Sequence, residues 1–397
     1  MLQVSLEYQI ARLIADTVCR SSTTAPPTLD PDPTMCREFA ASLFGHQFLP
    51  IVPQPNLSVL PEAILWMIGK SLPTRDAVTL GRSNKQLGHD LSRPVFGLKV
   101  TDYVDIETVL DPSRGWSRRK GVIGSFTAFR VSTLDGLAHL PGGTRQLMFN
   151  LPKETIVTSE MLPTHLTHLT FGDEFDQPIE NLKLPASLTH LTFGGNFDQP
   201  IEKLKLPAAL THLTFGDEFD QPIENLKLPD ALTHLTFGDN FDQPIENLKL
   251  PAALTHLTFG YFNQPVDHLK LPASLTHLTF DMMFDQSIED LTLPGSLQHL
   301  TFGSGFNQSV DYLDLPASLT HLTFGNDFDQ SVDNLELPAS LTHLAFGDRF
   351  NQTIEYLELP DSLTHLTFGD RFDQPIEELK LPASLTHLTF GDTASLG

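Results

Sequence analysis

The sequence has 397 residues, with 49 acidic and 25 basic side chains and a formal net charge of −24 at pH 7. The acidity belongs to one part of the chain, because residues 160–397 hold 35 of the acidic but only 9 of the basic side chains, a net −26, whereas residues 1–159 carry +2. A field of this sign repels phosphate backbones and anionic membrane surfaces, which argues against nucleic-acid and membrane partners.

The first part of the chain predicts a soluble N-terminal helix and a linker. Residues 1–20 have the apolar spacing of one helix, and Glu7, Arg12 and Asp16 interrupt it too often for a signal peptide or a membrane span. Residues 21–34 are rich in Pro, Ser, Thr and Asp, which predicts a flexible linker. The two cysteines of the whole chain show no zinc-ligand spacing and suit a reducing compartment. The sequence therefore predicts a cytoplasmic protein.

Residues 50–98 predict a small helical domain. Aliphatic residues follow Leu60-Pro61-Glu62 at helical spacing, and Pro61 fits the first turn of a helix, where its missing N–H costs nothing. Pro73 to Asp76 then turns the chain into a second amphipathic helix, and residues 99–135 form a connector.

This segment resembles an F-box, the helical module that docks on the Skp-type adaptor of cullin–RING ubiquitin ligases. The residues that match the pattern are Leu60, Pro61, Ile64, Ile68, Leu72, Pro73, Asp76, Leu80, Ser83 and Lys85. The match departs near its end, where Arg82 replaces the usual valine, Asn84 intervenes and no tryptophan follows. The resemblance implies that the adaptor is contacted by Leu60, Pro61, Ile64, Leu65, Ile68, Leu72, Pro73 and Leu80.

A tandem repeat fills the rest of the chain. The phrase LPxxLTHLTFG…FDQPIExLxLP begins at prolines spaced by 22 residues, with one step of 21 at Gly260-Tyr261-Phe262. The prolines are Pro163, Pro185, Pro207, Pro229, Pro251, Pro272, Pro294, Pro316, Pro338, Pro360 and Pro382. Residues 136–160 read as a degenerate capping repeat. A period in the twenties predicts a stacked solenoid over residues 161–397.

Each repeat has two halves that read apolar-x-x-apolar-x-apolar, which predicts two short strands per coil with alternate residues inward. Two phenylalanine columns, Phe171 to Phe390 and Phe175 to Phe372, are expected inside, and the Asp-Gln pairs of the turns are expected to satisfy backbone groups between coils. With the helical segment, these repeats predict an α+β chain overall.

The first strand exposes His and Thr in almost every repeat. Eleven histidines form one column, and zinc is not expected there, because ladder neighbours point in parallel about 4.8 Å apart whereas zinc needs ligands that converge at about 2 Å. A polar ladder is the plainer interpretation, and adjacent imidazoles should resist charging together. No metal, no other cofactor and no cluster of nucleophile, base and orienting group is apparent, so we expect a protein that is not an enzyme.

The other half of the repeat exposes residues that vary, which makes it the candidate target-binding surface; free drift of solvated positions is the alternative. A lysine column gives way to acidic residues and tyrosines along it. The candidates are Lys183, Lys205, Lys227, Lys249, Lys270, Tyr312, Asp314, Glu336, Tyr356 and Glu358.

The repeats resemble the FNIP repeat, a relative of the leucine-rich repeat named for a Phe-Asn-x-Pro-Ile turn, which stands here as Phe197-Asp198-Gln199-Pro200-Ile201. Chains that pair an F-box with FNIP repeats occur in amoebae and in the giant viruses that infect them. The resemblance implies a non-catalytic substrate receptor of an SCF-type ubiquitin ligase, which holds the Skp-type adaptor and an unknown protein target, in the host cytoplasm if the chain is viral. A protein-interaction scaffold with a non-functional F-box remains the alternative.

Overall fold

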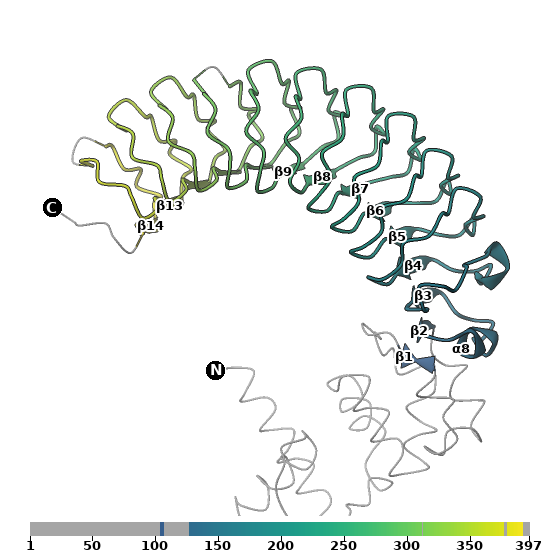
Figure 1. Cartoon of the computed structure of the whole chain (residues 1–397). Helices are drawn as coiled ribbons and strands as arrows, with labels where there is room; N and C mark the ends of the chain where they lie inside the picture. The colour runs from purple at the N-terminus through teal and green to yellow at the C-terminus, as the bar shows by residue number, and fades with distance from the viewer. Residues whose placement is uncertain (1–103, 107–126, 312, 377–378, 392–397) are drawn as a thin grey trace, which may run out of the picture. The chain divides into compact units, whose positions relative to one another are not determined.

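The computed structural model describes residues 104–106, 127–311, 313–376 and 379–391. Contacts divide the chain into two units, and the repeats lie in the unit made of Asp105–Thr108 and Phe129–Gly397. It is a solenoid in which each repeat makes one coil (Figure 1). The predicted helical domain at residues 50–98 lies outside the described residues.

One sheet of fourteen strands, in the order β1 to β14 along the chain, organises the described residues. Its strands from β3 to β14 pair in parallel. The strands before the regular repeats are β1 (Val104–Asp105), β2 (Ala128–Val131) and β3 (Gln146–Phe149). The regular coils contribute β4 (His168–Phe171), β5 (His190–Thr192), β6 (His212–Thr214), β7 (His234–Thr236), β8 (His256–Phe259), β9 (His277–Phe280), β10 (His299–Thr301), β11 (His321–Thr323), β12 (His343–Ala345), β13 (His365–Thr367) and β14 (His387–Thr389).

The expectation of an α+β fold is wrong for the chain that the structure describes. Within it, helix is limited to α8 (Leu134–Ala138) and the 3-10 helix η4 (Ser159–Met161). The repeats form no helix because each coil consists of a strand, tight turns and a short return. This leaves no run of residues in the repeat that is long enough to nucleate a helix. The described fold is an almost entirely β, leucine-rich-repeat-like solenoid.

Every repeat stacks on the next in register. His190 lies opposite His212, Leu191 opposite Leu213 and Thr192 opposite Thr214, and the same pairing links the successive coils. The degenerate repeat joins the same ladder, because Leu147 of β3 lies opposite Leu169 of β4. Identical residues therefore form columns along the solenoid, and all residues of one column share the same surroundings.

Within the described residues, the second predicted strand of each coil is not present. After the turn the chain returns through an arm, residues 201–207 in one coil, whose backbone is satisfied by local turns: Leu204 N–H donates to Ile201 O at 2.8 Å and Leu210 N–H to Pro207 O at 3.0 Å. Neighbouring return arms therefore do not need to be joined by a ladder of backbone hydrogen bonds. Figure 1 shows the strands on the inner side of the curved stack and the arms fanned out on the other side, as expected when only the inner side is held at hydrogen-bonding distance.

The predicted phenylalanine core is confirmed. Phe237 is 2% exposed, and its ring centroid lies 4.1 Å from that of Phe241 in its own coil and 5.4 and 5.5 Å from those of Phe215 and Phe259 in the adjacent coils. The leucines of the strands and the aliphatic residues of the return arms are buried against these rings. Buried aromatic area of this kind is the largest hydrophobic contribution available to such a thin coil.

The turn after each strand carries a polar ladder, also as predicted. The Oδ1 atom of Asp198 accepts a hydrogen bond from Asp220 N–H at 3.0 Å and another from the Gln221 side chain at 2.8 Å, both in the next coil. Asn takes the same role at Asn307. A glycine begins the turn because the coils meet there: a Cβ on Gly216 would collide with the carbonyl of Gly194.

Candidate functional site

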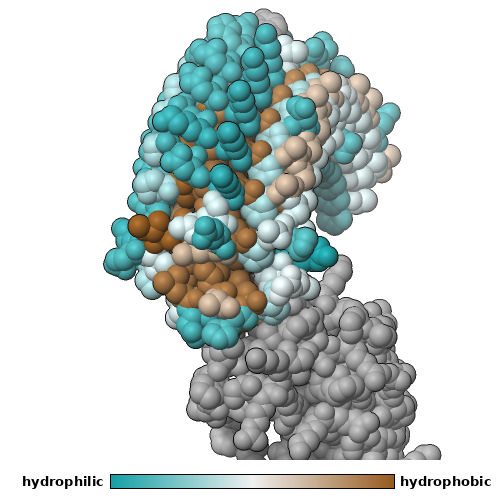
Figure 2. All heavy atoms as spheres, turned by 90° about the vertical axis from the view of Figure 1, so that its right-hand side faces the viewer, coloured by the Kyte–Doolittle hydropathy of each residue, from teal (hydrophilic) through white to brown (hydrophobic). Residues whose placement is uncertain are grey.

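Two polar surfaces run the length of the solenoid, one on each side of its core. The first, the histidine face, is the solvent side of β4–β14 and consists of the histidine and threonine columns. The second, the return-arm stripe, consists of the exposed residues of the return arms. Figure 2 shows polar side chains in continuous rows along the stack, with hydrophobic atoms visible in seams between the rows.

The return-arm stripe holds the predicted target-binding residues, and all those that the structure describes are exposed. These are Lys183, Lys205, Lys227, Lys249, Lys270, Asp314, Glu336, Tyr356 and Glu358. Tyr356 is the most apolar of them and is 66% exposed. Tyr312 lies outside the described residues. At the position of the lysine column, the stripe thus presents positive charge over the earlier coils and negative charge over the coils of Asp314, Glu336 and Glu358. Exposed glutamates such as Glu202 and Glu224 stand three residues before lysines of the column.

The charges of the stripe are mostly free to meet a partner. Lys203, beside the lysine column, lies 3.4 Å from Glu180 of the preceding coil, a solvent-exposed ion pair of the kind that contributes little to stability. Because the stripe residues are held at one position per coil by a buried core, they form a fixed array. An array of separated, exposed charges suits recognition of a protein surface.

The predicted adaptor contacts lie elsewhere in the sequence. Leu60, Pro61, Ile64, Leu65, Ile68, Leu72, Pro73 and Leu80 all fall outside the described residues. They remain a prediction from the sequence, and the two surfaces of the solenoid are the candidate site that the structure places.

The histidine face is built from stacked imidazoles. The rings of His190 and His212 lie 4.1 Å apart at 11° to one another, and ring centroids of successive coils throughout the column are 4.0–4.2 Å apart. Each ring except that of His299 has its Nδ1 atom 2.8–2.9 Å from the Oγ1 atom of the threonine that precedes it. Gln298 replaces that threonine before His299.

Proton binding by this column is unfavourable. Burial, and after it the charge of neighbouring imidazoles, lowers the pKa of nine of the eleven histidines below 6.5. The pKa of His277 and of His321 falls to about 4. The predicted resistance to joint charging is thus confirmed in direction, and these nine imidazoles are neutral at pH 7.

Carboxylates border the histidine face at the turns that follow β4, β6 and β7, whereas the turn after β5 has Gly195 and Asn196 at these positions. This acidic turn row consists of Asp173, Glu174, Asp217, Glu218 and Asp239. Burial, and then the nearby charges of Asp217 and Asp281, raises the pKa of Asp239, which shows that the carboxylates lie within one another's field. Arginines enter the turns only in later coils, where Arg349 pairs with Asp327 at 3.1 Å.

No three His, Cys, Asp or Glu side chains converge as a metal site would need in the part of the chain that the structure describes. The stacked imidazoles are parallel, so their lone pairs do not meet at a point. Likewise, none of the helices within the described ranges has the length and hydropathy of a membrane span.

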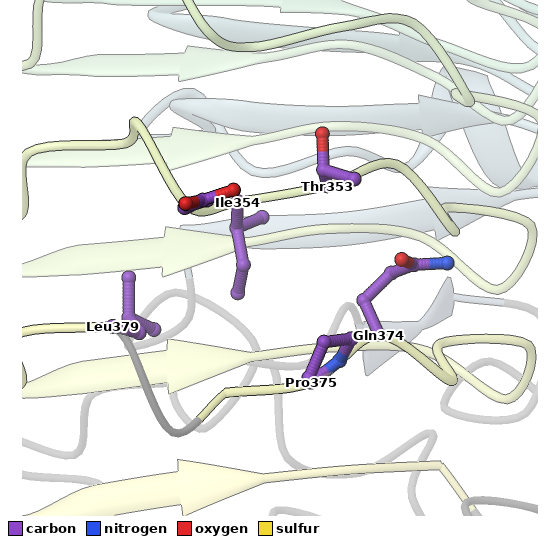
Figure 3. A pocket seen from close by; sticks show the side chains of 6 residues that line it. Thr353, Ile354, Gln374, Pro375 and Leu379 are labelled. Carbon is purple, nitrogen blue, oxygen red and sulfur yellow. The ribbon is translucent and has the colours of Figure 1, made fainter.

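A small hollow of about 160 Å³ lies between two return arms near the C-terminal end of the solenoid. Figure 3 shows Thr353 and Ile354 of one coil facing Gln374, Pro375 and Leu379 of the next. The hollow is smaller than the pockets that bind drug-sized molecules, and its lining offers no nucleophile with a base beside it. Its side chains suit contact with a partner's surface better than chemistry.

The sequence predicted a monotonous polar ladder on the histidine face and gave no role to the residue that precedes each histidine. That residue is threonine in ten of the eleven repeats, which was the available signal. In the structure its hydroxyl lies within hydrogen-bonding distance of the imidazole in each of those ten repeats. Only the distances show this contact, because the threonine neither faces the core nor varies.

Comparisons with known proteins agree with this architecture. The family model of the FNIP Repeat matches residues 156–196, 197–230, 219–261, 262–305, 306–349 and 350–393. The crystal structure of CroV588, described as a novel circular LRR protein, is 48% identical over 68% of this chain with a TM-score of 0.56, and the match spans 44% of that protein's chain. An internalin (InlF) from Listeria monocytogenes str. 4b F2365 is 19% identical over 67% of this chain and 78% of its own, with a TM-score of 0.49. No curated protein matches the sequence.

Proposed function

The chain belongs to the FNIP repeat family, and from this premise we propose that it is a non-catalytic target receptor of a cullin–RING (SCF-type) ubiquitin ligase. The solenoid would hold a protein target, and the segment from Leu60 to Lys85 would hold the Skp-type adaptor. Tethering raises the effective concentration of the target's lysines near the ubiquitin-loaded component, so the receptor itself needs no chemistry.

The observation that carries the target-binding half is the return-arm stripe. Its residues change identity from coil to coil while the core beneath them stays constant, and the described ones are exposed. A protein can read such a pattern because each coil adds one fixed, separate contact. Repeating ladders without a distinct acid, base or nucleophile support a binding role over an enzymatic one.

The adaptor-binding half rests on the sequence pattern alone, and a pull-down tests it. The intact chain should retain a Skp-type adaptor, and Leu60→Ala with Leu72→Ala should abolish that retention, because aliphatic anchors supply most of the energy of such a contact. Lys205→Glu is the matched control, since it alters the solenoid and should leave the adaptor bound. An intact chain that retains no adaptor would favour the interaction scaffold instead.

The stripe has its own test. Replacing Lys205, Lys227 and Lys249 together with glutamate should change the set of proteins that co-purify with the chain, because reversed charges repel the former partner surface. Arginine at the same three positions keeps the charge and should preserve most partners. A set of partners that is the same for the wild type and both variants would mean that the lysines serve solubility.

A further inference from the structure

The turn that follows β9 departs from the polar pattern of the turns before it. At the two positions before its buried phenylalanine, Phe284, it has Met282 and Met283. Met282 is 40% exposed and Met283 is 54% exposed, and among the described residues of the turns after β4 to β13 they are the exposed large hydrophobic side chains. The same two positions hold carboxylates, amides or glycine in four earlier coils: Asp173-Glu174, Gly195-Asn196, Asp217-Glu218 and Asp239-Asn240.

An aromatic ring lies beside these methionines. The turn after β8 is one residue shorter than the others, so Tyr261 stands directly before the turn phenylalanine, Phe262, and is half-buried. The ring centroids of Phe262 and Phe284 lie 6.3 Å apart, which places the residues that precede them, Tyr261 and Met283, side by side in adjacent coils. The next position of this column is Gly305, which has no side chain. We call Tyr261, Met282 and Met283 the methionine patch.

Carboxylates flank the methionine patch along the stack. Asp281 directly precedes Met282 and is exposed, and Asp239 of the coil before Tyr261 accepts the Tyr261 N–H on its backbone carbonyl at 2.8 Å. Burial, and then the charges of Asp217 and Asp281, raises the pKa of Asp239, so these carboxylates act on one another across the coil of Tyr261. The turns that follow β4 to β9 contain neither lysine nor arginine. The apolar patch therefore lies in a negative field.

The fold does not explain the methionine patch. The core beneath it is closed by Phe262 and Phe284, each 0% exposed, so the two exposed methionines add little buried area to the coil. Single exposed hydrophobic residues are common on protein surfaces, but here they adjoin one another in turns that are otherwise polar. Methionine and tyrosine are enriched at protein interfaces, and the flexible thioether of methionine adapts its shape to a partner.

We propose that the methionine patch docks a segment of a partner protein in which an aromatic residue is flanked by arginine or lysine. Thioether sulfurs make favourable contacts with aromatic rings, and the ring of Tyr261 offers a second aromatic surface. The flanking cations would meet the carboxylates of Asp239 and Asp281. This inference rests on the proposed protein-binding role of the solenoid. It adds a contact surface separate from the return-arm stripe and is independent of the adaptor.

A titration with short peptides tests the chemistry of the partner. The peptide Arg-Gly-Trp-Gly-Arg, blocked at both ends, is added to the full chain labelled with carbon-13 on its methionine methyl groups. It should shift the signals of Met282 and Met283 and bind about tenfold more tightly than the same peptide with alanine in place of tryptophan, because alanine buries much less apolar area. A peptide with serine in place of both arginines should bind about threefold more weakly at low salt, a difference that added salt removes.

Variants of the chain test the site itself. Met282→Gln with Met283→Gln keeps the length of both side chains and removes their apolar character, and the methyl signals that vanish assign the two residues. Its affinity for the tryptophan peptide should fall to that of the wild type for the alanine peptide, a loss of about tenfold. The control Tyr356→Gln removes an exposed apolar side chain from a return arm and should change the affinity by less than about twofold.

The outcomes decide the matter because the substituted residues are exposed and the variants keep the core intact, which circular dichroism verifies. Equal affinities for the tryptophan and alanine peptides would overturn the proposal, as would unchanged binding in the double-glutamine variant or an equal loss in Tyr356→Gln. Retention of the adaptor and the partners of the lysine stripe do not depend on these residues. Failure here is therefore distinguishable from failure of the ligase role.

Discussion

Replacing Phe237 by alanine tests whether the aromatic columns hold the coils together. The ring is 2% exposed and stacks on Phe241 and on the rings of both neighbouring coils, so its removal leaves a cavity that stacked coils cannot close without breaking register. Deletion of a buried phenylalanine costs about 3–5 kcal/mol. Because each coil contacts only its neighbours, the loss should fall on the coils of β6, β7 and β8.

The assay is urea unfolding followed by far-UV circular dichroism, with amide hydrogen exchange to locate the weakened coils. Phe390→Ala is the matched control: the same atoms are removed from the last described coil, where the ring has a neighbour on one side only, Phe368 at 5.7 Å, and is partly exposed. Its cost should be clearly smaller. Equal unfolding midpoints for the two variants, or a Phe237→Ala midpoint equal to that of the wild type, would refute the inward stacking of the rings.

Two further predictions concern the polar columns. The pKa of His277 and of His321 is about 4 in the folded chain against 6.5 as the ordinary value, so the unfolded chain binds more protons from just above pH 6.5 down to about 4. Stability should therefore fall as the pH drops from about 7.5 towards 4, and these two histidines should contribute no slope above about 7.5, where the unfolded imidazoles are also neutral. Urea midpoints measured from pH 7.5 to 5 test this, and His277→Phe with His321→Phe should flatten the slope; a slope that is zero in the wild type contradicts the pKa shifts. Asp220→Ala removes the acceptor of two hydrogen bonds from the next coil and should cost about 1–2 kcal/mol, whereas Asp220→Asn keeps the acceptor, as Asn307 does naturally, and should lie within about 0.5 kcal/mol of the wild type. Thermal melts distinguish the two, and equal costs would show that charge rather than hydrogen bonding matters there.

The repeat made much of the solenoid predictable from sequence. Identical residues at a period of 22 must stack in columns, so the burial of Phe237 and the ladder role of Asp198 followed from the phrase alone. The return arm was predicted wrongly, because its alternation of apolar residues satisfies a strand and an irregular return equally well. The distance between neighbouring return arms decides whether they form a strand or an irregular return. That distance depends on the curvature of the stack, which the residues of a single repeat do not specify.

The α+β expectation failed for a different reason. It combined a helical resemblance at residues 50–98 with the repeats, but the described chain adds only α8 and η4 to the sheet.

The one-strand coil explains why the two surfaces differ so much in how they vary from repeat to repeat. On the strand side, His190, Thr189 and the carbonyl of Thr167 are tied by hydrogen bonds that cross from coil to coil, so a change in one repeat disturbs its neighbours. On the return arm, the backbone hydrogen bonds join residues of the same coil. An exposed residue such as Lys227 or Glu336 takes no part in a ladder of hydrogen bonds between coils. A substitution at an exposed position of the return arm therefore lowers stability little, whereas a substitution on the strand side lowers it more. The exposed residues of the stripe can thus vary without disturbing the stack, while the histidine face keeps one constant chemistry.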